Sequence, residues 1–351
     1  MIAMSGGVDS SVSAALTADA VGPDACAGAA MRLYSMAEDA VRTGRTCCAP
    51  DDLYDARRAA ATVGIRFYVY DAQERFRAQV IEPFVQAYAT GETPNPCVRC
   101  NDHVKFDWLL DRARKLGAGA LVTGHYARVE LRAGRYRLLR AADPAKDQSY
   151  FLHGLTQEAL ELVRFPLGVL TKPEVRRIAR ERGLPNADKP ESMEVCFVGD
   201  TPLPRFLEEH GVRPRKGQVV DVAGNVLGSH EGVHRFTVGQ RRGIGSGFKL
   251  PLYVAALDAA GSRVVVGTRE QAQRRDFRAL DASWVHAAPA AGTRCEVQVR
   301  HRGRPLPAVL DPSGSAVEVK LLEPALGVAP GQSAVFYLGD EVLGGATIAA
   351  A

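Results

Sequence analysis

The sequence predicts an α/β fold in which a doubly wound parallel sheet is followed by a small β-rich domain and a C-terminal β-barrel. In the first 200 residues, short apolar runs alternate with helical patterns, which is typical of parallel strands joined by crossover helices. From about Thr201, glycines and prolines become frequent and short β-type runs replace the helical patterns. A chain of 351 residues is also too long for one average domain. We therefore expect domains over residues 1–200, 201–272 and 273–351.

The bulk composition excludes several protein classes. The chain is 46% hydrophobic and 24% charged, and no run of about 18 apolar residues predicts a membrane span. No basic region followed by an apolar segment marks a secretory signal, so we expect a cytoplasmic protein without a membrane partner. Its seven cysteines are then more typical of catalytic, metal-binding or buried thiols than of structural disulfides. The net charge of +4 does not by itself indicate nucleic acid.

A glycine turn opens the chain. The apolar run 2–4 predicts a strand, residues 5–11 a tight turn, and the following residues a helix to about Ala20. The two adjacent glycines permit positive φ, and the helix start offers unpaired N–H donors that suit a phosphate. Ser5 and Ser10 would add hydroxyl donors, and Asp9 could accept from them or hold Mg²⁺. The alternative is an ordinary turn with Asp9 or Ser10 as the helix N-cap.

Further strands and helices follow in alternation up to residue 183. The expected elements are a strand near Cys26–Tyr34, a helix over Asp51–Val63, a strand over Ile65–Tyr70, a helix with apolar spacing over 106–116, a strand over Ala120–Thr123 and a helix from Thr171 to Gly183. Parallel strands place a ligand outside their C-terminal ends. The last helix carries four arginines, which form either a solvated face or a surface for RNA.

Three cysteines form the second informative group. Cys97 and Cys100 lie between prolines and a helix expected to start near Val104, so we predict that a stiff loop presents them. A thiol at a helix N-terminus beside Arg99 would have a lowered pKa. Cys196 lies in an apolar run that predicts a strand.

Other roles for the cysteines stay open. Cys97 and Cys100 could form half of a zinc site that Cys47 and Cys48 complete, although adjacent cysteines are awkward ligands for one tetrahedral ion. Cys196 alone would more often be a buried small residue than a nucleophile. Cys26 and Cys295 lie in apolar strand patterns and are expected in the core.

The C-terminal domain carries a basic row. In the expected strand Cys295–Arg302, alternation places Val297 and Val299 on one face and Gln298, Arg300 and Arg302 on the other. Such a row suits phosphate contacts, and a solvated face is the alternative.

Several segments together identify a family. Ser5–Ser10 has the sequence Ser-Gly-Gly-Val-Asp-Ser, and the chain contains no Gly-x4-Gly-Lys-Ser/Thr motif, which favours adenylation over transfer of a γ-phosphate. The segments that match in order are Ser5–Ser10, Thr93–Asn101, Thr123–Tyr126, Lys146–Leu152, Val195–Gly199, Thr237–Gly243 and Pro330–Tyr337. Over essentially its whole length, the chain resembles the tRNA-specific 2-thiouridylases of the PP-loop ATP pyrophosphatase superfamily.

The resemblance implies an activity and its cofactors. Enzymes of this family are transferases (tRNA-uridine 2-sulfurtransferases) that use ATP and Mg²⁺ to adenylate the C2 oxygen of the wobble uridine in tRNA. A cysteine persulfide then supplies sulfur, and a second thiol frees it by forming a disulfide, with AMP and pyrophosphate as by-products. The implied partners are a tRNA with a wobble uridine and a cysteine desulfurase or sulfur-relay protein. The sequence does not identify the sulfur donor.

Matching motif to motif assigns roles to individual residues. Cys196 becomes the persulfide carrier and Cys100 the partner nucleophile. The residues expected around ATP are Ala3, Met4, Ser5, Gly6, Gly7, Val8, Asp9, Ser10, Met31 and Gly124. Those expected to contact tRNA or its target base are Asn95, Pro96, Cys97, His125, Lys146, Asp147, Gln148, Arg300, His301 and Gln332. Without the family, Lys146–Gln148 is read as an ordinary polar loop.

Two departures from the family leave alternatives. Cys97 stands where many members have an aspartate linked to proton transfer, so either Cys97 takes the acid–base role or a water or neighbouring group does. Alternatively, Cys97, Cys100 and Cys196 bind a [4Fe-4S] cluster, since thiolates are its usual ligands. Few residues precede Ser5, so we expect a short first strand or a start codon assigned too late.

Three competing functions remain. An amidating ligase of the same superfamily would share Ser5–Ser10 but would not need the three cysteines. A non-catalytic tRNA-binding protein would be expected to lose loop residues, yet Ser5, Asp9 and Ser10 are present. A zinc-dependent RNA-binding module is the third, and metal analysis would decide it.

Overall fold

The computed structural model describes residues 1–34, 50–191, 195–245 and 250–350. These residues pack as two compact units. The first comprises Met1–Ile81, Pro96–Asp200 and Asp340–Val342, and the second comprises Glu82–Asn95, Thr201–Gly339 and Leu343–Ala351. The expected fold class is confirmed, because a parallel sheet with helices lies in the first unit, and a β-rich middle part and a barrel lie in the second. The three predicted domain boundaries stay a prediction.

The first unit is built on a parallel sheet with strand order β3-β2-β1-β4-β7. Its strands are β1 (Ile2–Ala3), β2 (Ala27–Arg32), β3 (Arg66–Asp71), β4 (Leu121–Val122) and β7 (Val163–Arg164). The chain leaves β1 in one direction to β2 and β3, and then returns to β4 on the other side of β1. The order therefore reverses between β1 and β4, which is where such sheets bind ligands.

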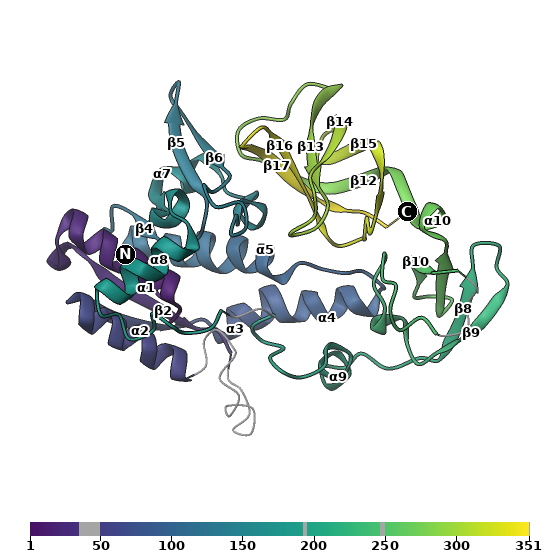
Figure 1. The fold of residues 1–351 in the computed structure, drawn as a ribbon, viewed down its shortest axis with the longest axis horizontal. Helices are drawn as coiled ribbons and strands as arrows, with labels where there is room; N and C mark the ends of the chain where they lie inside the picture. Colours follow the sequence, from purple (N-terminus) through teal and green to yellow (C-terminus); the bar gives the residue numbers. More distant parts are fainter. Residues whose placement is uncertain (35–49, 192–194, 246–249, 351) are drawn as a thin grey trace. The chain divides into compact units, whose positions relative to one another are not determined.

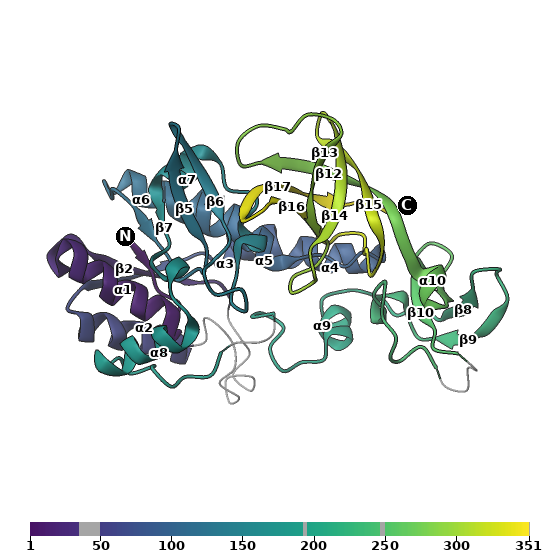
Figure 2. The same cartoon turned by 45° about the horizontal axis from the view of Figure 1, so that its top comes forward.

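Helices cover both faces of this sheet. Figure 2 shows α1 (Val8–Val21) and α2 (Pro50–Val63) on one side of the strands and α6 (Leu110–Lys115) on the other. On the α1 side, a third helix, α8 (Lys172–Glu181), packs against α1. The bounds of α1, α2 and α8 agree with the expected helices to within a few residues, and the predicted capping box of Thr171 and Glu174 is present.

The cysteine pair lies within a helix and not on a loop before one. Helix α5 (Pro96–Cys100) continues into the π-helical segment η4 (Asn101–Leu109) and then α6. The predicted loop before Val104 is therefore wrong. Pro96 occupies the first helical position, where its missing N–H costs nothing and its fixed φ favours the helix. Of the two prolines that we interpreted as helix breakers, Pro96 starts this helix.

Cys196 also differs from its prediction. Residues 196–200 form turns, and the Val198 N–H donates to the Val195 carbonyl over 3.0 Å. The expected strand is absent because Phe197 and Val198 are both buried, so the short apolar run packs as a compact turn. A short apolar run cannot be assigned by periodicity alone.

The remaining elements of the first unit connect the strands and helices. They are η1 (Pro23–Ala25), α3 (Gln73–Phe76), the π-helical η3 (Arg77–Ile81), the hairpin β5 (Arg128–Arg132) and β6 (Arg135–Leu139), η5 (Ser149–Leu152), α7 (Gln157–Leu162) and η6 (Pro166–Val169). The hairpin was not expected from the sequence. In the described part of the chain, no helix is long and apolar enough to cross a membrane.

The second unit begins with α4 (Glu82–Ala89) and continues at Thr201 with a four-stranded sheet of order β10-β11-β8-β9. The elements of this middle part are α9 (Leu203–Glu209), β8 (Gly217–Asp221), β9 (Val226–His230), η7 (Val233–Arg235), β10 (Tyr253–Asp258), β11 (Arg263–Gly267) and α10 (Arg269–Ala272). Val219, Val254, Val264 and Phe236 are buried together in its core.

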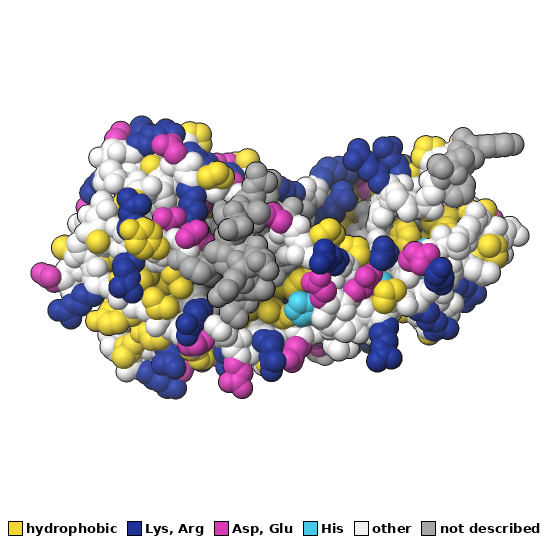
Figure 3. All heavy atoms as spheres, turned by 90° about the horizontal axis from the view of Figure 1, so that it is seen from below, with side chains coloured by type: hydrophobic (Ala, Val, Ile, Leu, Met, Phe, Trp, Pro, Cys, Tyr) yellow, Lys and Arg dark blue, Asp and Glu magenta, His cyan; other side chains and the backbone are white. Residues whose placement is uncertain are grey.

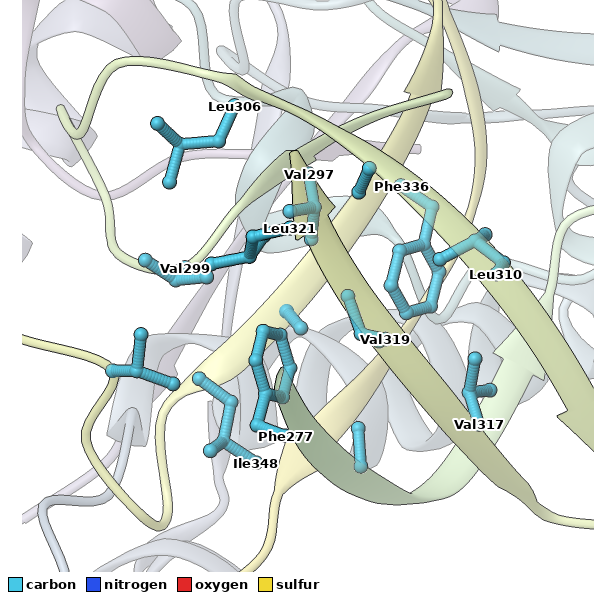
Figure 4. Packing of buried hydrophobic residues seen from close by; sticks show 14 of the residues in the cluster. Phe277, Val297, Val299, Leu306, Leu310, Val317, Val319, Leu321, Phe336 and Ile348 are labelled. Carbon is cyan, nitrogen blue, oxygen red and sulfur yellow. The ribbon is translucent and has the colours of Figure 1, made fainter. Parts of the chain in front are cut away.

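A closed β-barrel completes the second unit (Figure 1). Its strands are β12 (Gln273–Trp284), β13 (Thr293–Gln298), β14 (Leu306–Ser313), β15 (Ala316–Leu326), β16 (Ser333–Leu338) and β17 (Glu341–Ile348). Pairing of β12 with β17 closes the ring. Figure 4 shows Phe277, Val297, Val319 and Phe336 from different strands packed into its interior, as alternation along barrel strands requires.

Candidate active site

The glycine turn forms an open helix N-terminus. Gly6 has φ +79°, and a Cβ there would lie 2.2 Å from the Asp52 carbonyl oxygen. Gly7 is the N-cap of α1, and no side chain caps it by a hydrogen bond. The alternative in which Asp9 or Ser10 is the N-cap is therefore wrong. The first N–H groups of α1 stay available to an anion, and the helix dipole favours one.

Hydroxyl and amide groups fix the shape of this loop. Ser10 Oγ donates to the Gly7 carbonyl over 2.9 Å, and the Ser5 N–H donates to Ser10 Oγ over 3.2 Å. Buried Asn186 donates through Nδ2 to the Gly6 carbonyl over 2.9 Å and to Ser11 Oγ over 2.8 Å. The loop is thus braced from within and from a residue far along the chain.

Gly124 lies at the switch between β1 and β4. A Cβ at this position would lie 2.8 Å from the Ser10 backbone nitrogen, so only glycine allows β4 to end so close to α1. Ala3 ends β1, and Met31 lies in β2 at the same edge of the sheet. Met4 and Val8 are buried and support the loop from the core. Their predicted contacts with ATP stay predictions.

Asp9 belongs to an ion-pair chain that the sequence did not reveal. Lys172 Nζ lies 2.7 and 2.8 Å from the two Asp9 carboxylate oxygens, and the Tyr126 hydroxyl donates to Asp9 over 2.8 Å. Lys172 also lies 2.7 Å from Glu191, whose second oxygen lies 2.5 Å from Lys146 Nζ. We call Asp9, Lys172, Glu191 and Lys146 the ion-pair chain. It joins the glycine turn to the loop that begins at Lys146.

Within the ion-pair chain, the surroundings of Glu191 favour its ionised carboxylate. Burial opposes ionisation of Glu191, but hydrogen bonds from Lys146 and Lys172 outweigh it and lower the pKa of the carboxyl to about 2. Burial, and then the adjacent Asp9 carboxylate, raise the pKa of Tyr126, so its hydroxyl keeps the proton that it donates. Buried Lys172 lies between the Asp9 and Glu191 carboxylates, with its side-chain nitrogen next to the first turn of α1.

Lys172 and Glu191 were missed because they lie far from Asp9 in the sequence. One local signal was present. Lys172 occupies the first position of α8, where a cation opposes the helix dipole. A nearby anion would offset this unfavourable interaction, and the structure supplies two, Asp9 and Glu191.

The two predicted sulfur-handling segments are anchored to the same helical stretch. Arg99 Nε donates to the Gln79 carbonyl over 2.8 Å, which attaches α5 to η3. Phe197 packs edge-on against Phe76 at the end of α3, with ring centroids 5.6 Å apart. The attachment points lie within about one turn of each other, because α3 runs directly into η3. Helix Gln73–Ile81 thus supports both Cys100 and Cys196.

The cysteines differ in exposure and in local support. Cys97 is exposed, Cys100 is buried and Cys196 is half-buried. The Tyr34 hydroxyl donates to the Cys196 carbonyl over 2.7 Å. Asn101, directly after Cys100, donates to the Phe151 carbonyl over 2.9 Å. The π-helical segments η3, to which α5 is attached, and η4, which follows Cys100, are of a kind frequent at functional sites.

The described residues form no clustered metal site of their own. Among them, no group of three or more His, Cys, Asp or Glu side chains is arranged to hold an ion. This includes Cys97, Cys100 and Cys196, so the predicted iron–sulfur cluster finds no support. Cys47 and Cys48 lie outside the described residues. The core prediction for Cys26 and Cys295 is confirmed, since both are buried.

Several residues predicted to meet tRNA are engaged within the protein. His125 is buried between Phe106 and Phe165, and its Nδ1 lies 2.7 Å from Thr123 Oγ1. Burial, and then the charge of Lys105, lower the pKa of His125 well below its usual value, so the ring is neutral. A neutral imidazole can stack on a base or form a hydrogen bond, but it does not attract phosphate by charge.

The loop at Lys146 shows the same pattern. Asp147 accepts hydrogen bonds from the Ala141 N–H over 3.0 Å, from both donors of Ser149 over 3.2 and 2.9 Å, and from Arg140 over 3.3 Å. Gln148 Oε1 accepts from the Tyr126 N–H over 3.0 Å. These contacts fold the loop that carries Lys146.

The basic row of the barrel lies on a turn. Strand β13 ends at Gln298, which is buried and donates through Nε2 to the Arg300 carbonyl over 3.2 Å. The predicted outward face for Gln298 is therefore wrong, and Arg300 lies beyond the end of the strand. Arg300, Arg302 and Arg304 are exposed on the turn that follows, next to partly buried His301.

The arginines of α8 favour the solvated interpretation. Arg177 pairs with Glu181, Arg180 with Asp188 and Arg182 with Asp19, while Arg176 donates to backbone carbonyls. Figure 3 shows one face of the molecule on which Lys and Arg are interspersed with Asp and Glu, as the mild net charge predicts.

Comparison with known proteins bears on this geometry. Three family descriptions match in succession: a tRNA methyl transferase HUP domain over residues 1–200, a tRNA methyl transferase PRC-barrel domain over 204–268 and an aminomethyltransferase β-barrel domain over 274–348. A protein of Geobacter metallireducens named tRNA-specific 2-thiouridylase MnmA is 49% identical, with 100% of this chain and 96% of the relative aligned. The chain belongs to the tRNA-specific 2-thiouridylase family.

Other similar proteins carry the same name. Proteins with the same name from Geotalea uraniireducens and Acidobacterium capsulatum are 47% and 46% identical, and each alignment covers 99% of this chain and 94% or 98% of the relative. Among solved structures, NMN synthetase from Francisella tularensis aligns with 53% of this chain and 63% of its own at a TM-score of 0.30 and 17% identity, too distant to bear on fold or function.

Proposed function

We propose that the protein converts the wobble uridine of tRNA to 2-thiouridine, with ATP as the activating substrate and a persulfide on Cys196 as the immediate sulfur source. The observation that carries the proposal is the open helix N-terminus at Ser5–Ser10, held beside Lys172, in a chain aligned over its whole length with tRNA-specific 2-thiouridylases. A cytoplasmic location and a cysteine desulfurase or relay protein as sulfur donor stay predictions.

The nucleotide would bind at the edge where β1 and β4 diverge. The N–H groups that open α1 and the hydroxyls of Ser5 and Ser10 would receive its phosphates, and Ala3, Met4, Met31 and Gly124 would border the nucleoside. Lys172 Nζ contacts Asp9 in the first turn of α1, and it would help to neutralise the phosphate charge there.

Mg²⁺ fits the donor set at Asp9. Carboxylate oxygen is the ligand that Mg²⁺ prefers, and Asp9 presents both oxygens at the loop, where Lys172 and Tyr126 now bind them. When bound, the ion would neutralise phosphate charge. This chain's own contribution is to orient Asp9 through the Tyr126 hydroxyl and the Lys172 ammonium.

The proposed reaction has three steps. In the first, the uracil C2 oxygen attacks the α-phosphorus of ATP, a new O–P bond forms, and the bond to the bridging oxygen breaks to release pyrophosphate. In the second, the terminal sulfur of the Cys196 persulfide attacks C2 and AMP leaves. Cys100 thiolate then attacks the Cys196 sulfur, which forms the Cys100–Cys196 disulfide and leaves sulfur on the uridine. An external thiol reductant must reopen that disulfide before the next cycle.

The anchoring of both cysteine segments on Gln73–Ile81 supports this division of labour. Exposed Cys97, in the first turn of α5, is the candidate for the acid–base role, and it would lie with Asn95 and Pro96 beside the target base. We assign tRNA contacts to Arg300 and His301 and to His125, and to the loop Lys146–Gln148, which Asp147 and Gln148 hold in shape.

Nucleoside mass spectrometry tests the proposal. An unmodified tRNA with a wobble uridine is incubated with the protein, Mg·ATP and a sulfur source, next to the variants Cys196→Ser and Cys295→Ala. We expect a 2-thiouridine peak that requires ATP, persists in Cys295→Ala and is lost in Cys196→Ser. Cys295 is a matched control because it is a buried barrel cysteine outside the proposed chemistry.

Other outcomes would overturn parts of the proposal. Pyrophosphate release without any 2-thiouridine, even with a persulfide-generating desulfurase present, would contradict sulfur transfer. Absence of both products, with turnover of ATP and ammonia on a carboxylate or carbonyl substrate, would favour the amidating ligase.

A further inference from the structure

A loop of the barrel, residues 330–332, is hydrogen-bonded to Thr93 and Pro94. These two residues directly precede Asn95–Cys97, the predicted contacts with the target base. The Thr93 N–H donates to the Pro330 carbonyl over 2.8 Å. In return, Gln332 Nε2 donates to the Thr93 carbonyl over 2.7 Å and to the Pro94 carbonyl over 3.3 Å. All of these residues lie in the second unit. We call Pro330, Gly331 and Gln332 the Thr93 clamp.

The fit between the clamp and the segment is close. Gly331 has φ +86°, and a Cβ there would lie 3.1 Å from the Thr93 nitrogen, the Thr93 carbonyl carbon and the Glu92 Cβ. This is tighter than nine in ten real Cβ contacts, so an added methyl group would displace the neighbouring atoms, and the positive φ independently favours glycine. The segment therefore rests directly on the clamp's backbone.

The clamp is itself fixed to the barrel. The Gly331 N–H donates to the Ile348 carbonyl over 2.9 Å, and the Ile348 N–H donates to the Gln332 carbonyl over 2.8 Å. These bonds tie the loop to the last residue of β17, which closes the ring with β12. Movement of the clamp thus requires movement of the barrel.

The gripped segment is short and stiff. On one side, Glu92 N–H donates to the Ala87 carbonyl over 2.8 Å at the end of α4. On the other side, Pro94 and Pro96 restrict the backbone up to the start of α5. A displacement of the Thr93 backbone would therefore be transmitted almost fully to Asn95 and the first turn of α5.

The chemistry of Gln332 argues against a direct role on phosphate. A primary amide has two N–H donors and one acceptor oxygen, and phosphate oxygens only accept hydrogen bonds. The Gln332 Nε2 group is engaged with two carbonyls, which leaves the oxygen as its remaining polar atom. That atom repels a phosphate.

We propose that Gln332 is a positioning residue that fixes Asn95–Cys97 for the target base through the Thr93 clamp, and that its effect on the reaction does not come from a contact with phosphate. This inference rests on the proposed function for the meaning of that segment. It assigns the barrel a second task, which is to set the position of the segment that enters the catalytic helix.

The test compares Gln332→Glu with Gln218→Glu. Both changes add the same charge to the second unit, but the Gln218 side chain is exposed on β8, outside the Thr93 clamp. Three quantities are measured: amide hydrogen exchange over residues 92–95, tRNA affinity, and the single-turnover rate of 2-thiouridine formation at saturating tRNA. In Gln332→Glu the donors are lost and a carboxylate faces two carbonyls, so we expect exchange to rise and the saturating rate to fall by about tenfold each. The tRNA dissociation constant should match that of Gln218→Glu.

A second variant covers the case in which Gln332→Glu does not fold. Gly331→Ala keeps the Gln332 amide but pushes the clamp away from Thr93, and it should raise exchange and lower the saturating rate in the same way.

Two results separate the possible failures. Weaker tRNA binding in Gln332→Glu than in Gln218→Glu, with unchanged exchange and saturating rate, would overturn the clamp and make Gln332 a direct contact. Wild-type protein that forms no 2-thiouridine would overturn the proposed function alone, because the exchange measurement needs no tRNA and still judges the clamp.

Discussion

The glycine turn at Ser5–Ser10 and the polar loop at Lys146–Gln148 are joined by the ion-pair chain but differ in what their sequences determine. In the turn, backbone N–H groups provide the candidate binding surface, and Gly6 adopts a conformation that few other residues tolerate. In the polar loop, side chains carry the motif, and two of three are engaged in holding the loop together. Local sequence therefore predicts backbone sites better than side-chain contacts, because each polar side chain has several potential partners and only the fold selects among them.

The largest expected effect comes from Gly6→Ala. The new methyl group would meet the Asp52 carbonyl at 2.2 Å and add strain at φ +79°. We expect pyrophosphate release to fall more than about 100-fold and the free energy of unfolding to fall by roughly 2–4 kcal/mol. A pyrophosphate assay and denaturant unfolding measure the two.

The control for this change is Gly22→Ala. Gly22 ends α1 with φ +86° and open space around its Cβ position, so the variant carries the conformational cost without the clash. Equal loss of pyrophosphate release in both variants would contradict this prediction, because the close contact of Gly6 with Asp52 would then not matter for ATP use.

The next effect is expected from Lys172→Met. Removal of the ammonium leaves the Asp9 and Glu191 carboxylates facing one another without their shared cation. We expect pyrophosphate release to fall about 100-fold and the free energy of unfolding to fall by roughly 2–3 kcal/mol. Arg177→Met, which breaks an exposed pair with Glu181 on the same helix, should cost under about 0.5 kcal/mol. Normal ATP use in Lys172→Met would show that the chain is structural only.

The smallest effect on chemistry is expected from Asp147→Ala. Its hydrogen bonds to Ala141 and Ser149 would be lost, and we expect the free energy of unfolding to fall by roughly 2 kcal/mol. The salt dependence of tRNA binding should not change. Arg302→Gln should do the opposite, with unchanged stability and a salt slope smaller by about one. A changed slope in Asp147→Ala would show that the shape of this loop controls the ionic contacts with tRNA, and it would remove the contrast.

The sequence predicted well those elements that local patterns determine. Helices α1, α2 and α8, with the Thr171 capping box, follow from periodicity and end signals. It failed where one short pattern fits two structures, as at Pro96, which starts α5, and at Cys196, which lies in a turn. The pairing of Asp9 with Lys172 could not be predicted, since it joins residues from opposite ends of the first unit's chain. The roles of the cysteines rest on the family and stay predictions.

Closure of the barrel by β12 and β17 has a consequence for how this protein is made. Strand β12 can pair with β17 only after β17 has left the ribosome, so the pairing of Ala279 with Ile348 forms last. Until then the nascent barrel has two unpaired edges lined by apolar strands, which invite pairing with other chains. Such long-range pairing also folds slowly. We therefore expect chains that stall before β17 to be aggregation-prone and dependent on chaperones.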